Sequence, residues 1–524
     1  MTELMDTALV FVYNKLNASV ILYRQYTDCE KCPLLPSIDV GPNSTRSVRL
    51  STKWDNEFSI RNNETQNFEY FNFVKSLWDQ GKYQIIVEQT SNGITYSFET
   101  LESGRNNIWP IIGAIAFYIL AAILWIVGLN AYRRYKSDRT VSNASDAPLT
   151  SEEKPGTTSA NLKKKKRLKS LDCFRGIDML MMIFVNFGAG GYYYLDHAPW
   201  NGLHFADVIF PWFIFMMGTS MAMSLRSQVV THKKKILDVF WKITFRSMKL
   251  IGIGLLLATR GREPISLFRD ILPYWIEWIF MLAFGLIYAM LTFVWHYDKS
   301  GYCPPGYLGP GGLHMNMTRW NCTGGAAHYI DVKVFTNNHI YQHTTSSELY
   351  NPDGIYHVVI SHDPEGLLGC CTSIILTFLG LQVGKILVAY QQPVQRMARW
   401  MVWGLVLGGI AATLHFTKWE PINKNLWSFS FIGCTGGMGF IAITLLYYVV
   451  DVKNWWKNGQ PFHFAGMNSI LLYVGSEMTF SLIPWTFYIN SSSHLPHLAL
   501  NLWTATLWLT IAIVLARKKI FWTL

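Results

Sequence analysis

The sequence predicts a polytopic α-helical membrane protein with a small β-rich domain at its N-terminus. Of its 524 residues, 50% are hydrophobic and 15% are charged, whereas a soluble domain carries about 25% charged residues. The apolar residues also gather into long runs, and a helix that crosses a bilayer needs about 20 of them. These observations exclude an ordinary soluble enzyme and a disordered chain. The 8 Cys are too sparse for a small disulfide scaffold.

Residues 1–108 are expected to form the β-rich domain, on the lumenal side of a membrane. Polar and apolar residues alternate in stretches such as 83–89 and 94–99, as in half-buried strands. Cys29 and Cys32 form a C-x-x-C pair, which is either a disulfide or two free thiols, because a zinc site would need two more ligands nearby. Candidate N-glycosylation sites in this domain are Asn17, Asn43 and Asn63.

About ten apolar runs are long enough to span a membrane. They are expected at residues 109–130, 174–194, 205–225, 243–259, 273–294, 369–390, 398–416, 426–450, 465–488 and 499–516. The first is a single helix, and residues 131–170 after it form a linker rich in Ser, Thr, Lys and Asp that is expected to be disordered. Residues 171–524 make up one transmembrane domain, with a long loop at 295–368.

The distribution of charge predicts which segments face the cytosol. The net charge of +11 comes from residues 131–170, at +7, and residues 225–249, at +6, and cytosolic loops attract Lys and Arg. Residues 1–108 and 295–368 are each at −3 and are therefore expected to be lumenal. This location of the charge also argues against nucleic-acid binding, although the basic run at 163–167 could serve as a nuclear signal.

The crossing count conflicts with this sidedness at one point. The predicted span at 243–259 starts from a cytosolic loop and ends in the lumen, and loop 295–368 is also lumenal. An even number of crossings must separate them, but the sequence contains one apolar run there, at 273–294. Either a helix is missing, one span is re-entrant, or the sidedness of one half is wrong.

The segment 171–224 contains polar groups within and between apolar runs. Asn186 lies inside a predicted span, Asp196 and His197 follow at its lumenal end, and Asp207 opens the next span. Such groups are costly in an apolar layer, so they indicate a functional site. The alternative is that they bond to one another and hold helices together. Arg175 and Asn201 are further polar residues of this segment.

A neutral imidazole can accept a proton or an acyl group near neutral pH, which makes His197 the candidate catalytic residue. Asp196 and Asp207 are candidates to orient it, and the Asn186 amide can donate to a carbonyl or an oxyanion. A histidine base with an amide donor suits acyl transfer. The sequence has no Walker loop and no zinc-protease H-E-x-x-H, and we expect no metal.

Several stretches from residue 168 onward resemble the heparan-α-glucosaminide N-acetyltransferase family of lysosomal membrane acyltransferases. They are LKSLDCFRGI, FVNFGAGGYYYLDHAPWNGLHFADVIFPWFIFMMG, CPPGYLGPGG, NCTGGAAHYID, DPEGLLG, PINKNLWS, GMNSILLYVG and RKKIFW. The resemblance implies acetyl transfer from cytosolic acetyl-CoA to the terminal glucosamine amine of heparan sulfate in the lysosomal lumen. It assigns the catalytic positions to His197 and Asn186. His197 either carries the acetyl group or deprotonates the amine, and the second route is favoured because it needs one chemical step.

Further roles are expected for other polar residues and cysteines. Asp207, Asn201 and Asp196 support the site, and basic residues at the cytosolic side contact the CoA phosphates, unless they are ordinary positive-inside residues: Arg175, Arg246 and Lys249. Substrate-binding candidates are Asn423, Asn425, Trp427 and Asn468. A lumenal disulfide is expected between Cys303 and Cys322. Further glycosylation sites are Asn316, Asn321 and Asn490.

The chain departs from the family pattern near residues 260–272, where a family helix is missing and the family's eleven spans become ten. This gap lies where the number of crossings disagrees with the predicted sidedness. One hypothesis is therefore that a segment is omitted here and that the chain is an inactive truncated isoform. The competing function classes are a transporter or channel, which also uses intramembrane Asp, Asn and His, and a structural membrane protein. The expected partners are acetyl-CoA, heparan sulfate, the lipid bilayer and a second copy in a homo-oligomer.

Overall fold

The protein is described by a computed structural model. It covers residues 5–27, 29, 32–62, 69–91, 93–144, 168–226, 275–310, 319, 321–342, 344, 346 and 361–522. Several predicted features lie outside these residues, namely the span at 243–259, the segment 260–272, Arg246, Lys249, Asn63 and Asn316.

The N-terminal region is a β-sandwich. One sheet has the order β4-β1-β7-β8 and the other β3-β2-β5-β6. The strands are β1 (Thr7–Asn14), β2 (Val20–Tyr26), β3 (Leu35–Val40), β4 (Ser44–Ser51), β5 (Asn56–Asn62), β6 (Glu69–Lys75), β7 (Lys82–Thr90) and β8 (Gly93–Glu102). Alternate side chains of both sheets, such as Val10, Leu22 and Ile85, are fully buried between them. The period-two pattern of the sequence is the cause, because successive strand residues face opposite sides.

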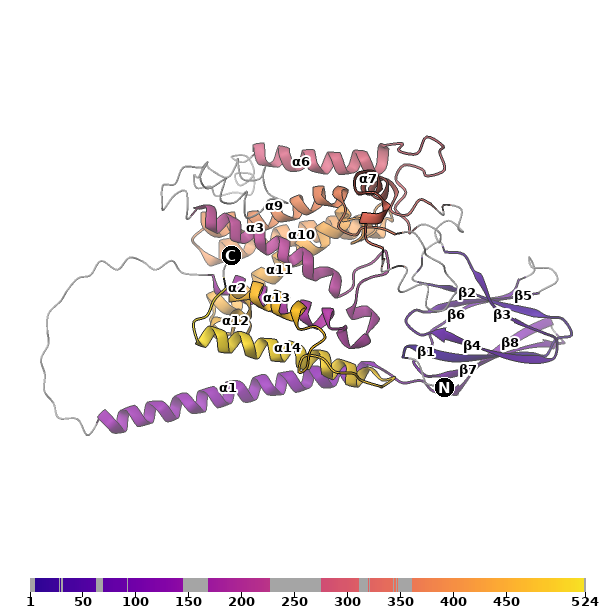
Figure 1. The fold of residues 1–524 in the computed structure, drawn as a ribbon, viewed down its shortest axis with the longest axis horizontal. Coiled ribbons are helices and arrows are strands. Elements are labelled where there is room, and N and C mark those ends of the chain that lie inside the picture. Colours follow the sequence, from indigo (N-terminus) through magenta and orange to yellow (C-terminus); the bar gives the residue numbers. More distant parts are fainter. Residues whose placement is uncertain are drawn as a thin grey trace, which may run out of the picture.

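The remaining chain is a helical bundle, so the predicted fold class is confirmed. Among the described residues, seven helices are long and apolar enough to cross a membrane. The helices are α1 (Ile108–Ala144), α2 (Lys169–Asn186), α3 (Ile209–Arg226), α6 (Trp275–Ala289), α7 (Gly325–Phe335), α9 (Leu367–Ala389), α10 (Pro393–Phe416), α11 (Phe429–Leu446), α12 (Phe462–Met467), α13 (Ser469–Met478) and α14 (His494–Arg517). Figure 1 shows α1 along one side of the bundle, next to α14.

Three predicted spans have different boundaries in the structure. The span expected at 109–130 is α1, which continues to Ala144, so residues 131–144 are helical and not part of a disordered linker as predicted. The span expected at 174–194 is α2, which ends at Asn186, because three glycines at positive φ, Gly188, Gly190 and Gly191, turn the chain into a loop. The span expected at 465–488 is divided into α12 and α13. The break lies at Asn468, whose side chain bonds to the backbone of the C-terminal segment, at Ile520 and Trp522.

Close backbone approach holds the centre of the bundle together. A Cβ atom on Gly218 of α3 would clash with the carbonyl oxygen of Thr377, and one on Gly380 of α9 would clash with that of Phe215. Thr219 Oγ1 donates a 2.9 Å hydrogen bond to the Gly380 carbonyl across the same crossing. Small residues at membrane helix crossings permit such contacts.

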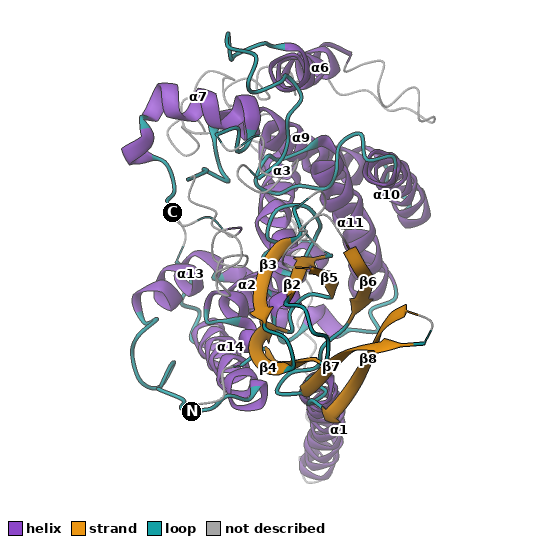
Figure 2. Cartoon of the chain, turned by 90° about the vertical axis from the view of Figure 1, so that its right-hand side faces the viewer, coloured by secondary structure: helices purple, strands orange, loops and turns teal. Residues whose placement is uncertain are grey.

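The β-sandwich packs against one end of the bundle, as Figures 1 and 2 show. Asp6 accepts a 2.8 Å hydrogen bond from His494 Nε2, and Gln80 donates one of 3.0 Å to the Ser492 carbonyl. Trp54 stacks edge-on against Tyr193, with ring centroids 4.8 Å apart. The domain therefore contacts the loop that follows α2, which carries the candidate site.

Candidate active site

His197 lies in the loop between α2 and α3. The same loop contacts Trp54 of the β-sandwich domain through Tyr193 and His204. The loop is fixed to α14 by hydrogen bonds on both sides of Gly190. The Gly190 N–H donates to Asn501 Oδ1 at 2.7 Å, and the Gly190 carbonyl lies 3.0 Å from His494 Nδ1. The glycine-rich sequence after α2 permits this sharp turn, because Gly adopts positive φ at little cost.

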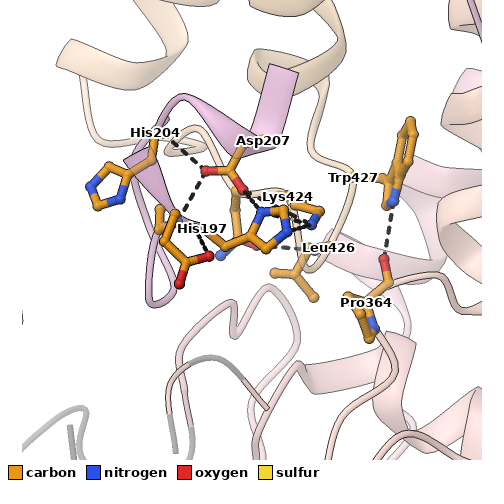
Figure 3. A network of polar contacts seen from close by, with 10 residues as sticks. His197, His204, Asp207, Pro364, Lys424, Leu426 and Trp427 are labelled. Atoms are coloured by element: carbon orange, nitrogen blue, oxygen red, sulfur yellow. Dashed lines mark hydrogen bonds and ion pairs between the residues drawn. The ribbon is translucent and has the colours of Figure 1, made fainter. Parts of the chain in front are cut away.

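Asp207 orients the His197 imidazole. Its Oδ1 lies 2.7 Å from His197 Nδ1, and its Oδ2 accepts the N–H groups of Ala198, at 3.1 Å, and His204, at 2.9 Å (Figure 3). The Asp207 side chain is fully buried, whereas that of His197 is 34% exposed. A carboxylate only accepts, so Nδ1 carries the proton and Nε2 is left with a lone pair. This is the arrangement of a general base held by a buried acid.

Asp196 and Asn201 support the loop. Asp196 Oδ1 accepts the His197 backbone N–H at 2.7 Å, so it fixes the backbone of His197 while Asp207 fixes its ring. Asn201 Oδ1 accepts a 3.1 Å hydrogen bond from Asn423 Nδ2. This bond joins the loop to the turn between α10 and α11.

That turn carries Lys424 to the imidazole. Lys424 Nζ lies 3.0 Å from His197 Nδ1, 3.3 Å from His197 Nε2 and 4.0 Å from Asp207 Oδ1 (Figure 3). Its side chain is 18% exposed. Loss of water lowers the pKa of Lys424 below its ordinary value, and the negative charge of Asp207 opposes this effect. From the sequence, Lys424 is one of several polar residues of this turn, and it was not assigned to the site, unlike its neighbours Asn423 and Asn425.

Asn423, Asn425 and Trp427 shape this turn. The buried Asn423 accepts the Leu426 N–H through Oδ1 at 3.0 Å. The Asn425 carbonyl lies 2.9 Å from Nε2 of the buried His362, and Trp427 Nε1 donates to the Pro364 carbonyl at 3.0 Å. The turn is thus anchored to the loop before α9, and these hydrogen bonds hold Lys424 in position.

Asn186 and Asn468 lie apart from the imidazole. Asn186 Nδ2 donates a 2.8 Å hydrogen bond to Glu477 of α13, and no bond to His197 occurs among the described residues. Asn468 is buried at the junction of α12 and α13, where it binds the C-terminal segment. The structure therefore brings together His197, Asp207, Asp196, Asn201 and the turn at 423–427. It leaves out Asn186 and Asn468.

Arg175 lies in the second turn of α2, 11 residues before Asn186. It donates a 2.6 Å hydrogen bond to Ser220 Oγ and lies 3.6 Å from Asp172. Its side chain is 23% exposed. A guanidinium that keeps some exposure can still reach an anionic group.

Two cysteine pairs are joined in the structure. Cys303 and Cys322 form a disulfide in the long loop, with their Cα atoms 5.5 Å apart, and both residues are buried. Cys29 and Cys32 form a second disulfide in the β-sandwich, beside Trp54. Asn321, next to Cys322, is exposed.

The fold and the site define a polytopic membrane protein. At one end of its helices, a histidine is oriented by a buried aspartate, an arrangement that suits acyl transfer. A family model described as "Heparan-alpha-glucosaminide N-acetyltransferase, catalytic" matches residues 167–296. The chain is 32% identical to the heparan-alpha-glucosaminide N-acetyltransferase of Mus musculus over 602 residues, covering 99% of this chain and 89% of the relative. It is 31% identical to that of Homo sapiens over 597 residues, covering 99% and 88%.

The chain belongs to the heparan-α-glucosaminide N-acetyltransferase family and is an acyltransferase. Both alignments are longer than the 524 residues of this chain. The relatives therefore contain segments that have no counterpart here.

Proposed function

We propose that this protein transfers the acetyl group of acetyl-CoA to the amine of a terminal glucosamine on heparan sulfate, as a step in its degradation. The family supports the acyl transfer and, through the names of the relatives, the acceptor. The observation that carries the proposal is the contact between His197 and the buried Asp207, because N-acylation needs a base to take a proton from the amine.

His197 acts as that base through Nε2. The Nδ1 proton is held by Asp207, so the lone pair of Nε2 faces away from the carboxylate. As the amine attacks the thioester carbonyl carbon, Nε2 takes the amine proton, and Asp207 stabilises the imidazolium that forms. The proton then passes to the sulfur of the leaving CoA. Direct transfer needs no acetyl-histidine, and the partial exposure of the ring leaves room for the amine.

The proposal includes a role for Asn186 in binding the thioester. Its amide is bonded to Glu477, and both side chains are exposed. A thioester carbonyl that binds Asn186 has to replace this acceptor. Arg175, in the N-terminal half of α2, is a candidate contact for the CoA phosphates, together with Arg246 and Lys249.

We infer that the β-sandwich and the long loop face the lysosomal lumen and that the basic segments 131–170 and 225–249 face the cytosol. The charge distribution supports this sidedness. The site then lies at the lumenal end of the bundle, where the polymeric acceptor is found, and the acetyl donor enters from the basic side. The exposed Asn321 provides a test, because its glycosylation in cells requires a lumenal loop. An unmodified Asn321 would contradict the orientation of the second half.

The direct test uses membranes from cells that express the full chain. Labelled acetyl-CoA and a heparan fragment with terminal glucosamine are supplied, and the acetylated sugar is measured. We expect product from the wild type and a loss of roughly 10²–10⁴-fold in His197→Ala. The matched control, His339→Ala, changes an exposed histidine of the long loop and should retain wild-type turnover.

Two outcomes would contradict parts of this proposal. A folded wild-type chain that forms no acetylated sugar would exclude the transferase reaction and favour a transporter that uses the same polar groups, or a chain inactivated by its missing segment. A labelled acetyl group trapped on His197 would exclude direct transfer in favour of the two-step route.

A further inference from the structure

The Lys424 ammonium has donors that no described side chain uses. The two ring nitrogens of His197 lie within hydrogen-bonding distance of Lys424, and the carboxylates of Asp207, Glu365 and Asp196 attract its charge from further away. Nδ1 already carries a proton that it gives to Asp207. The Nε2 lone pair, at 3.3 Å, is the one acceptor on the ring, and the proposed mechanism uses it for the amine proton. The turn at 423–427 holds this cation in a largely buried position, where N–H groups without acceptors are costly.

Asp207 pairs with the charge of Lys424 but does not accept a hydrogen bond from it. Its two oxygens accept from His197, Ala198 and His204, and Lys424 Nζ is 4.0 Å from Oδ1, which is beyond hydrogen-bonding distance. The attraction between the two charges keeps Lys424 near the site. Its N–H groups remain available to a ligand beside His197.

We propose that Lys424 is a catalytic residue that donates a hydrogen bond to the thioester carbonyl oxygen and stabilises the oxyanion formed during acetyl transfer. This inference rests on the proposed function and deepens it. The amine forms a bond to the carbonyl carbon, and the carbonyl electron pair moves to the oxygen, next to the Lys424 ammonium. When this pair returns, the bond from carbon to sulfur breaks, and the thiolate takes the amine proton from His197.

The geometry favours this oxygen as the ligand. The amine nitrogen gives its proton to Nε2 and attacks the carbonyl carbon, which comes to lie about one bond length from that nitrogen. The carbonyl oxygen is therefore within reach of Lys424 Nζ, which lies 3.3 Å from Nε2. A donor aimed at the developing charge contributes about 10²–10³-fold to turnover in comparable sites. Burial increases this effect, because a low dielectric strengthens the interaction of charges.

Two other roles make different predictions. A lysine that binds a sulfate or carboxylate of the acceptor would affect KM for the acceptor and leave kcat unchanged. A lysine that only balances the charge of Asp207 would affect folding or the orientation of His197, independently of the acyl donor.

The experiment compares Lys424→Met and Lys424→Arg with wild type in the membrane assay, using acetyl-CoA and fluoroacetyl-CoA as donors. Fluorine stabilises an oxyanion by withdrawing electrons, so it substitutes in part for the lysine. We expect Lys424→Met to lose roughly 10²–10³-fold in kcat with acetyl-CoA. With fluoroacetyl-CoA, the loss in kcat should be smaller by a factor of at least about ten. Lys424→Arg keeps the charge and should lose less. The control Lys418→Met, an exposed residue before the same turn, should match wild type.

Equal losses of Lys424→Met with both donors, or a rise in acceptor KM at unchanged kcat, would overturn the inference and leave the proposed function intact. Wild-type membranes that produce no acetylated sugar would refute the proposed function, and the inference with it. Thermal melting of each variant shows whether a loss comes from unfolding, and Lys424→Arg tests the charge if Lys424→Met does not fold.

Discussion

The Asn186 amide donates a 2.8 Å hydrogen bond to Glu477, a residue 291 positions further along the chain. This bond joins the end of α2 to α13. His197 follows 11 residues after Asn186, in the loop between α2 and α3. In the proposed mechanism, a thioester carbonyl that binds Asn186 has to displace the Glu477 carboxylate.

Removing Glu477 should separate the two roles of Asn186. We expect Asn186→Ala to lower kcat by roughly 10²-fold, because a thioester donor is lost. Glu477→Ala should stay within about threefold of wild type, since the amide is then free for the substrate. The double variant should equal Asn186→Ala, as measured by turnover of labelled acetyl-CoA. A Glu477→Ala loss as large as that of Asn186→Ala would show that the pair acts structurally.

Asp207 should matter more than its neighbour Asp196. In Asp207→Asn, an amide cannot accept from Nδ1 and from both backbone N–H groups, so the His197 tautomer and the loop are disturbed. We expect kcat to fall by roughly 10²–10⁴-fold. Asp196→Asn keeps an oxygen that accepts the His197 N–H and should lose less than about tenfold. Comparable losses in both variants, at unchanged melting temperature, would argue against the orienting role of Asp207.

Sequence reasoning located the part of the site that is local in the chain. His197 and Asp207 are ten residues apart, and the polar residues of one short loop indicate a shared site before any fold is known. Lys424 and Glu477 are 227 and 291 residues from their partners. Which lysine or glutamate reaches the loop depends on how the helices pack, and a hydropathy pattern has no information about that contact.

The same distinction applies to the fold. The long apolar runs predicted α9, α10 and α14 well, because a spanning helix needs only length and apolar composition. The runs at 174–194 and 465–488 did not predict their helices fully, because neither run forms one continuous helix. Hydropathy is similar for a continuous helix and for one that breaks, and the breaks depend on tertiary bonds such as that of Asn468 to the C-terminal segment.

The buried His362 should make the protein less stable in acid. Desolvation lowers the pKa of His362 to about 4, below the usual 6.5, although the Asn425 carbonyl opposes this shift; His328 lowers it further, and Asp363 acts in the opposite direction. The unfolded chain then binds more protons between pH 6.5 and 4, so this contribution to stability is present above pH 6.5 and is lost as the pH falls.

The variant His362→Gln tests this effect, because it retains a hydrogen-bond donor but does not titrate. We expect its melting temperature to change less than that of wild type when the pH falls from 7 to 4.5. The difference corresponds to a free energy on the order of 3 kcal/mol at the acid end. His339→Gln, in an exposed position, is the control. Parallel melting curves for wild type and His362→Gln across this range would contradict the assignment.

Adding one methyl group at the crossing of α3 and α9 should disrupt the bundle. In Gly380→Ala, the new Cβ would clash with the carbonyl oxygen of Phe215, and backbone atoms cannot move aside without separating the helices. Separation would also break the bond from Thr219 to the Gly380 carbonyl. We expect a loss of at least about 1–3 kcal/mol, seen as a lower melting temperature and reduced yield in detergent. Gly409→Ala is the matched control, since a Cβ there meets no atom within 4 Å, and it should remain as stable as wild type. Equal melting temperatures for Gly380→Ala and Gly409→Ala would contradict the close approach of α3 and α9.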